Sequence, residues 1–173
     1  MSASVWKVNV AVVLCVVGCA DTQSPPERYS HVGVLNADET HLFTVGGADA
    51  DGPMADAWRY DLTRDRWKEM DALPVPLYRA TALQIDDLAY VFGGTTSGLE
   101  ESESLYLWDL SDGSWEEING ASNDVPRGRY KHAASLWDWS PEGAGPGFVV
   151  SGGRNNDDET VTFDDLWHFD VAA

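Results

Sequence analysis

Three glycine pairs, each at the end of a short apolar run, constrain the fold of this 173-residue chain more than any other feature. The runs are "LFTVGG" ending at Gly47, "AYVFGG" ending at Gly94 and "FVVSGG" ending at Gly153. A polar loop follows each pair, and an aromatic segment follows each loop: "DAWRYDL" at 56–62, "SLYLWDL" at 104–110 and "DLWHFDV" at 165–171. Self-similarity at a regular spacing is typical of repeat architectures. The chain is therefore expected to contain three copies of one unit.

Other residues recur with the glycines. A Trp follows the Asp of the first two aromatic segments by six residues, as in Asp61 to Trp67 and Asp109 to Trp115. An Arg precedes each apolar run, in "RYSH" at 28–31, "RATA" at 79–82 and "RYKH" at 129–132. In this alignment the second copy has Ala82 where the others have His31 and His132, and the third copy has no final Trp.

Paired glycines, spaced aromatics and a period of about 50 residues resemble the kelch motif, a four-stranded propeller blade. The resemblance covers residues 27–173 and implies an all-β fold with about 2.75 blades of an incomplete β-propeller. It divides the chain into repeats at 28–78, 79–128 and 129–173, the last without its fourth strand. The next expected Trp falls at about position 176, so the chain is interpreted as ending inside a blade. Open blade edges predict self-association or marginal stability.

The repeated residues have a structural interpretation. Glycine pairs permit sharp turns and close approach of strands, and the aromatic side chains supply large apolar areas between stacked blades. The runs that end in glycine are β-rich and uncharged, which predicts strands buried between neighbouring blades. The predicted structural residues are Gly46, Gly47, Gly93, Gly94, Gly152, Gly153, Trp58, Tyr60, Trp67, Tyr106, Trp108, Trp115, Trp167 and Phe169.

The first 27 residues differ from the repeats. One Lys precedes an apolar run from Val8 to Val17, and small and polar residues follow, which is the layout of a secretory signal peptide. "VVGC" at 16–19 resembles a bacterial lipobox, which implies lipidation of Cys19 in a signal peptide of residues 1–19, then a tether at 20–27. The prediction is a lipoprotein of the cell envelope. The alternative is cleavage after Ala20 and a secreted or periplasmic protein.

Charge and cysteine content exclude several functions. The formal net charge is −18, and such an acidic chain repels phosphate backbones, so nucleic-acid binding is not expected. Both cysteines, Cys15 and Cys19, lie in the N-terminal segment. The repeats therefore lack a disulfide, a thiolate metal site, a cysteine nucleophile and the Tyr–Cys cofactor that propeller-type galactose oxidases require.

Candidate sites are few. No metal site, cofactor or catalytic constellation is predicted: the equivalent His31 and His132 suggest a structural hydrogen bond to a neighbouring strand, and His41 and His168 are isolated. The loops after the glycines are acidic, and propeller geometry places them on one face. Their candidate partner-binding residues are Asp49, Asp51, Glu100, Glu101, Asn155 and Asp157. They could bind Ca²⁺ or a basic partner, although solvated loops are the simpler interpretation.

The recurring arginines Arg28, Arg79 and Arg129 have two interpretations. They could line a central channel and bind an anionic ligand, or pair with blade acids such as Asp61 and Asp109, which is the interpretation we favour. Functionally, the sequence favours a non-enzymatic binding module for a protein or glycan partner. The alternatives are a fragment of a carbohydrate-active propeller enzyme, similar to mutarotases or oxidases, and a truncated product without activity.

Overall fold

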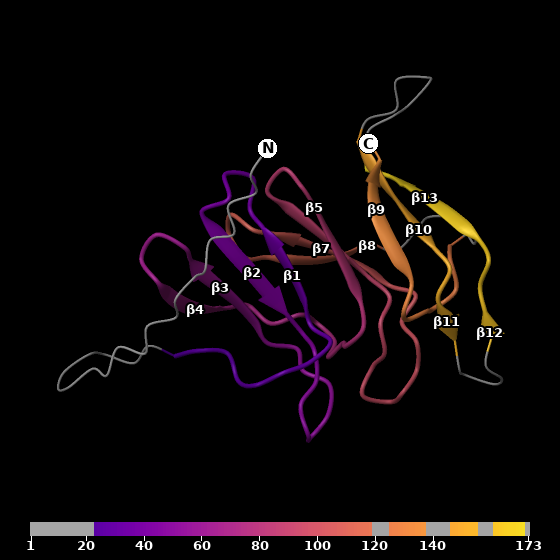
Figure 1. Cartoon of the computed structure of the whole chain (residues 1–173), viewed down its shortest axis with the longest axis horizontal. Coiled ribbons are helices and arrows are strands. Elements are labelled where there is room, and N and C mark those ends of the chain that lie inside the picture. Colours follow the sequence, from indigo (N-terminus) through magenta and orange to yellow (C-terminus); the bar gives the residue numbers. More distant parts are fainter. Residues whose placement is uncertain (1–22, 119–124, 138–145, 156–160, 172–173) are drawn as a thin grey trace, which may run out of the picture.

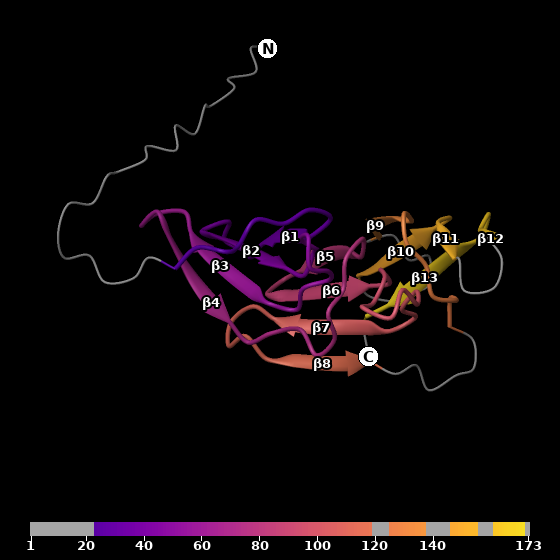
Figure 2. The same ribbon diagram turned by 90° about the horizontal axis from the view of Figure 1, so that it is seen from below.

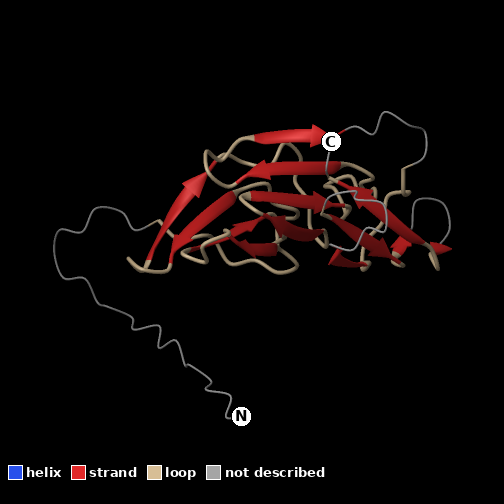
Figure 3. Ribbon diagram, turned by 90° about the horizontal axis from the view of Figure 1, so that it is seen from above, coloured by secondary structure: helices blue, strands red, loops and turns tan. Residues whose placement is uncertain are grey.

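The computed structural model describes residues 23–118, 125–137, 146–155 and 161–171. The described residues form strands, turns and loops, and Figure 3 shows no helix among them. None of the described segments is a helix long and apolar enough to cross a membrane. The predicted signal peptide and lipobox, the first three residues of the predicted tether, and Asp157 lie outside these residues.

The strands build two four-stranded antiparallel sheets and part of a third, which we number as blades 1, 2 and 3 (Figure 1). Blade 1 contains β1 (Val32–Leu35), β2 (His41–Val45), β3 (Ala57–Asp61) and β4 (Arg66–Met70), in that order. Blade 2 contains β5 (Thr81–Ile85), β6 (Leu88–Phe92), β7 (Leu105–Asp109) and β8 (Trp115–Ile118). Blade 3 contains β9 (Ala133–Trp137), β10 (Gly147–Ser151) and β13 (Leu166–Asp170), and a separate hairpin of β11 (Arg154–Asn155) and β12 (Val161–Thr162).

These sheets confirm the predicted all-β blade architecture, with about three blades and no closed propeller among the described residues. The first strand of each blade contacts the first strand of the next, β1 with β5 and β5 with β9. The first strands therefore lie where the blades converge, and later strands lie progressively outward. Figure 2 shows the resulting stack of sheets seen from below.

Alternation along the strands gives each blade two faces. We call the face turned toward the preceding repeat the leading face and the other the trailing face. Phe43 and Val45 on the trailing face of blade 1 pack against Ala89, Val91 and other leading-face residues of blade 2. A second cluster joins the trailing face of blade 2 to the leading face of blade 3, with Tyr90, Phe92, Leu105, Phe148 and Val150. The run of blade 2 is thus buried between two blades, as predicted, whereas the runs of blades 1 and 3 are each covered by a described blade on one face.

The glycine pairs are needed because the blades meet at them. The backbone N–H of Gly47 donates to the Leu77 carbonyl oxygen (2.8 Å), and that of Gly94 donates to the Arg129 carbonyl oxygen (2.8 Å). Both bonds cross from one blade to the next. A Cβ added at Gly93 would lie 2.6 Å from the Arg129 carbonyl oxygen, and its φ of 69° lies in the left-handed region. Only glycine fits such a position without distortion.

The register of the second repeat corrects the sequence alignment. Backbone bridges join Tyr29 to Ala48, Tyr78 to Thr95 and Tyr130 to Arg154, and each bridge follows directly after a glycine pair. The three tyrosines are therefore equivalent positions. The counterpart of Arg28 and Arg129 in blade 2 is Leu77 rather than Arg79, and the counterpart of His31 and His132 is Ala80 rather than Ala82. The alignment of "RATA" was displaced by two residues, because its Arg lies after the common Tyr instead of before it.

The aromatic residues follow the blade geometry. Trp108 and Trp115 stack with ring centroids 4.7 Å apart, and the Trp115 Nε1 donates to the Asp71 carbonyl oxygen of blade 1 (2.9 Å). Phe169 stacks on Phe148 at 4.6 Å. Tyr60 and Trp67 form the equivalent pair in blade 1, at 4.8 Å. Trp67 was expected between blades, but it lies on the leading face of blade 1, where the described residues place no blade against it.

Candidate functional site

Three equivalent Tyr-X pairs line the inner edge of the molecule at the glycine end of the blades. They are Tyr29–Ser30 of blade 1, Tyr78–Arg79 of blade 2 and Tyr130–Lys131 of blade 3, and we call them the tyrosine rim. The Arg79 backbone N–H donates to the Ser30 carbonyl oxygen (2.9 Å), so neighbouring blades are joined directly at this rim. Each pair immediately precedes the first strand of its blade, which the fold holds near the centre.

The second residue of each pair has an uncommon backbone conformation. The φ angles are 55° at Ser30, 62° at Arg79 and 57° at Lys131. A positive φ is sparsely populated by residues other than glycine, and such strain is concentrated at binding and catalytic sites. The same conformation in three successive blades shows that the fold imposes it. The fold therefore places a different side chain, Ser30, Arg79 or Lys131, at the same rim position of each blade.

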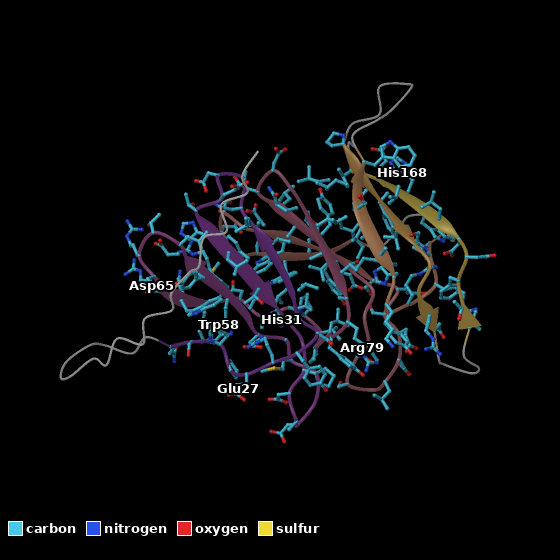
Figure 4. The ribbon with its side chains drawn as sticks, in the orientation of Figure 1. Glu27, His31, Trp58, Asp65, Arg79 and His168 are labelled. Carbon is cyan, nitrogen blue, oxygen red and sulfur yellow. The ribbon has the colours of Figure 1, made fainter. Side chains whose placement is uncertain are left out.

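Arg79 lies between the aromatic rings of two blades. Its guanidinium carbon is 4.5 Å from the centre of the Tyr78 ring and 5.2 Å from the centre of the Tyr130 ring. The Lys131 ammonium lies 5.6 Å from the same Tyr130 ring. Arg79 forms no ion pair with any described residue. Both rings attract the guanidinium, and its N–H groups can donate to an acceptor. Figure 4 labels Arg79 at this edge of the molecule.

The acidic loops surround the rim. Figure 1 shows the loops after the glycine pairs of blades 1 and 2, and the β11–β12 hairpin, at the same edge of the molecule. Asp51 and Glu100 are exposed there, whereas Asp49 accepts hydrogen bonds from the backbone of its own turn. Glu101 is 8% exposed. Asn155 is buried and donates to the Gly128 carbonyl oxygen. The structure thus brings these loops onto one face, but it builds two of the candidate side chains into the blade packing.

Arg28 and Arg129 form ion pairs, as we favoured, but with different acids. Arg28 binds both carboxylate oxygens of Asp56 and donates to the Gly46 carbonyl oxygen (3.0 Å). Arg129 binds both oxygens of Asp165 (2.6 and 2.8 Å) and donates to the Gly152 carbonyl oxygen (2.9 Å). The acids named from sequence, Asp61 and Asp109, are instead held by the turns that follow them. Each arginine therefore fastens the first glycine of its own blade to the start of the third long strand.

Electrostatics matches this structural role. Hydrogen bonds from Arg129 lower the pKa of Asp165 more than burial raises it. Burial alone raises the pKa of Asp56, but hydrogen bonds from Arg28 and Trp58 outweigh it and lower the pKa overall. Blade 2 has neither charge, because Leu77 and Ser104 occupy the positions of the arginine and the aspartate. The pair has been replaced as a unit by a buried apolar side chain and a small polar one.

His132 links blades 2 and 3. Its Nε2 lies 2.7 Å from the Thr81 hydroxyl oxygen, and its ring packs edge-on against Phe92 at 5.4 Å. For His132 this confirms the predicted hydrogen bond to a neighbouring strand, whereas the His31 side chain makes no such bond to any described residue. Burial and the nearby Arg129 charge lower the pKa of His132 to about 4. The equivalent His31 is exposed, with a pKa lowered by partial burial and by Arg28. His41 and His168 lie on different blades, and no cluster of metal-binding side chains occurs among the described residues.

Sequence reasoning missed the tyrosine rim. The repeated Tyr29, Tyr78 and Tyr130 were visible in "RYSH", "LYRA" and "RYKH", but alignment on the arginine hid their equivalence. The recurring Tyr was the signal that could have found this equivalence, because in each blade it forms a backbone bridge with the residue that follows the glycine pair.

Comparison with known proteins gives a consistent match. The model of the KLHDC2/KLHL20/DRC7 Kelch-repeats domain matches residues 4–173. The chain is 31% identical over 117 residues to the serine/threonine-protein phosphatase BSL2 of Arabidopsis thaliana, covering 64% of this chain and 11% of that protein. It is 30% identical over 97 residues to beta-scruin of Limulus polyphemus, covering 52% of this chain and 10% of that protein.

A third relative, kelch-like protein 41b of Danio rerio, is 24% identical over 140 residues, which covers 75% of this chain and 21% of that protein. The chain thus corresponds to between a tenth and about a fifth of these three relatives. The similarity identifies the type of repeat that the chain contains.

Proposed function

The chain belongs to the kelch-repeat family, and we propose that it is a non-enzymatic binding module whose tyrosine rim binds a protein segment carrying a carboxylate. The position of Arg79 between two tyrosine rings is the observation that carries this proposal. A guanidinium offers two parallel N–H groups to a carboxylate, and this geometry favours bidentate binding. The aromatic contacts also reduce the entropy that the side chain loses on binding.

A protein partner fits the rest of the rim. Tyr29 is 56% exposed on blade 1, and Leu99, in the loop after the second glycine pair, is 71% exposed with a φ of 65°. Tyrosine and arginine are residue types enriched at the centres of protein–protein interfaces; in the rim Tyr29 is exposed, Tyr78 and Arg79 are half-buried and Tyr130 is buried. The loops around them carry the exposed acids Asp51 and Glu100. A matching segment therefore has one carboxylate for the centre of the rim and basic residues beside it.

A binding role also agrees with the groups whose pKa values are perturbed. Asp56 and Asp165 are held by arginines of their own blades, and His132 is buried against blade 2. Each of these groups joins strands or blades. Perturbed pKa values occur in structural networks as well as in active sites, and here the partners of each group are structural.

The test is binding of peptides by the complete chain. The probe is a labelled peptide with one glutamate flanked by lysines, compared with the same peptide carrying glutamine. We expect the glutamate peptide to bind more tightly, and Arg79→Leu to weaken its binding about tenfold or more, since a charge-assisted hydrogen bond contributes about 1.5–3 kcal/mol. The matched control is Arg66→Leu, at an exposed arginine on the outer strand β4.

Equal affinity for the two peptides, or unchanged binding by Arg79→Leu, would refute the proposal. Binding of glycans on an array without binding of either peptide would replace the protein partner by a sugar. Arg79→Lys separates charge from geometry: we expect it to bind the glutamate peptide more weakly than the native chain, because an ammonium is not planar.

We also propose that the module is exported and anchored by a lipid on Cys19. The support is the lysine, the apolar run and the lipobox-like "VVGC" at 16–19. In bacterial cells, Cys19→Ala should move the protein from the membrane fraction to the soluble fraction, whereas Cys15→Ala should leave it with the membrane. Retention of the Cys19→Ala protein by membranes would contradict a lipid at this residue. A native protein found only in the soluble fraction would favour cleavage after Ala20.

A further inference from the structure

A cleft lies between blades 1 and 2, at the ends of the strands away from the tyrosine rim. Its volume is about 250 Å³. The β1–β2 turn closes one side of the cleft, and the β5–β6 and β7–β8 turns of blade 2 lie on the other. Figure 1 shows the β1–β2 and β5–β6 turns at the edge of the molecule opposite the loops that follow the glycine pairs. The cleft is therefore separate from the rim, and what binds in it is independent of the ligand proposed for the rim.

The internal repeat shows that the side chains of this cleft depart from those of the next blade contact. His41 and Arg59 lie on the trailing face of blade 1. The strand registers make them equivalent to Leu88 and Leu107 of blade 2. Both leucines pack against the apolar cluster between blades 2 and 3. Two positions that are apolar in one blade contact thus carry an imidazole and a guanidinium in the other, and the cleft opens beside them.

Arg59 supplies a positive charge to the cleft. It is half-buried and forms no ion pair with any described residue. Lys68 lies directly opposite Arg59 on β4, and like charges at directly opposite positions destabilise a strand pair. Arg64 of the same hairpin, in contrast, pairs with Asp61 at 2.8 Å. The charge of Arg59 is therefore not compensated within the described part of the blade, and it is available to an anionic group in the cleft.

Asp87 supplies a negative charge from the other side of the cleft. It is exposed in the β5–β6 turn, and one of its carboxylate oxygens accepts a hydrogen bond from the Ala37 backbone N–H at 3.4 Å. Asp38 also lines the cleft, but its carboxylate is already occupied by the backbone N–H and the hydroxyl group of Thr40. Arg59 and Asp87 thus line one cleft without forming an ion pair with each other.

The cleft also has an apolar lining that both blades build. Phe43 of blade 1 and Leu110 of blade 2 line it, and they are 2% and 3% exposed. Both belong to the apolar cluster between these blades, in which the Phe43 ring packs edge-on against Trp108 at 5.4 Å. The packing of the blades holds this part of the lining in place. A ligand in the cleft therefore meets an apolar floor together with a guanidinium and a carboxylate.

We propose that this cleft binds a free amino acid with an apolar side chain. Arg59 binds the carboxylate of the ligand by two parallel hydrogen bonds, and Asp87 binds its ammonium group. The side chain of the ligand lies against Phe43 and Leu110. Asp87 would repel a simple anion and Arg59 would repel a simple cation, so the lining favours a ligand that carries both charges. Pockets for drug-sized ligands have volumes of about 300–1,000 Å³, and the smaller cleft of about 250 Å³ suits a single amino acid.

The test is isothermal titration calorimetry of the complete chain. The probes are L-leucine, L-valine and L-phenylalanine, and the one that binds most tightly is compared with its amide and with its N-acetyl derivative. The amide lacks the carboxylate, and the N-acetyl derivative lacks the ammonium group. We expect each derivative to bind more weakly by about tenfold or more, because each loses a charge-assisted hydrogen bond. Absence of binding by all three amino acids, or equal binding by either derivative, would overturn the proposal.

Variants connect the ligand to these side chains. Arg59→Leu copies Leu107 of blade 2 and should weaken binding of the amino acid by about tenfold or more. Arg66→Leu, at an exposed arginine of β4 outside the cleft, is the matched control and should bind like the native chain. Asp87→Asn should weaken binding of the amino acid and leave that of the N-acetyl derivative unchanged. Arg79→Leu should not change the affinity, so the cleft is tested separately from the rim. Urea unfolding checks that each variant folds, and Arg59→Gln replaces Arg59→Leu if the latter does not. Affinity that survives substitution of Arg59 or Asp87 would refute the proposed contacts.

Discussion

We predict that the Arg129–Asp165 ion pair of blade 3 can be replaced by the uncharged pair that blade 2 has at the same positions. The Arg129 side chain is completely buried, whereas that of Asp165 is 33% exposed. Blade 2 replaces the equivalent pair by Leu77 and Ser104 and keeps the same strand order. We therefore compare Arg129→Leu, Asp165→Ser and the double variant, which gives blade 3 the side chains of blade 2.

The exposures determine the expected energies. Asp165→Ser leaves a guanidinium without its counter-charge in a fully buried position, and breaking a buried pair in this way costs about 3–5 kcal/mol. Arg129→Leu leaves a carboxylate that water still reaches, so its cost should be lower, about 1–2 kcal/mol. The double variant should lie within about 1 kcal/mol of the native chain, because an apolar side chain often replaces a buried ion pair without loss.

The assay is urea unfolding followed by tryptophan fluorescence at pH 7. The midpoint should fall most for Asp165→Ser and recover in the double variant, with an unchanged dependence of the unfolding free energy on urea. The coupling between the two sites is the quantity of interest, and it comes from the four proteins of the cycle. Additive costs for the two substitutions, or a double variant less stable than Asp165→Ser, would refute the reasoning that the pair acts as one replaceable unit.

Two further predictions concern contacts between blades. The pKa of His132 is about 4 in the folded chain and 6.5 in the unfolded chain, so neutral His132 contributes its full stability above pH 6.5 and loses it as the pH falls toward 4. The loss of unfolding free energy is about 3 kcal/mol at most. His132→Ala, which copies Ala80, should make the unfolding free energy less dependent on pH between 7 and 4.5. An equal pH dependence of the variant and the native chain would contradict this. Gly93→Ala should lower the unfolding free energy by about 2 kcal/mol or more, because the new Cβ meets the Arg129 carbonyl oxygen. The control, Gly98→Ala, should change the unfolding free energy little. Equal effects of the two substitutions in thermal unfolding would show that the close approach at Gly93 is unimportant.

The blade architecture could be predicted because its determinants are local. Glycine pairs, alternating apolar residues and aromatic segments recur at constant spacing, and each copy specifies the same strands. The hydrogen bond of His132 to a neighbouring strand was predicted from the recurrence of His31 and His132 in two repeats. The register of the second repeat could not be obtained in this way, because the most conspicuous residue, Arg79, lies two positions from the arginine position of the other blades.

The candidate site depended on distances that no repeat contains. Tyr78 and Tyr130 belong to different blades, and their common contact with Arg79 exists only after the blades converge. The sequence also could not decide whether Asp56 or Asp61 pairs with Arg28, because both acids lie in one aromatic segment. Only the folded sheet places Asp56 beside Arg28 and the first glycine. The sequence by itself determined the repeated unit, its strands and its buried faces, since these follow from local periodicity. The tertiary structure decided which charges pair and which remain at the rim, because those contacts join residues from separate strands and blades.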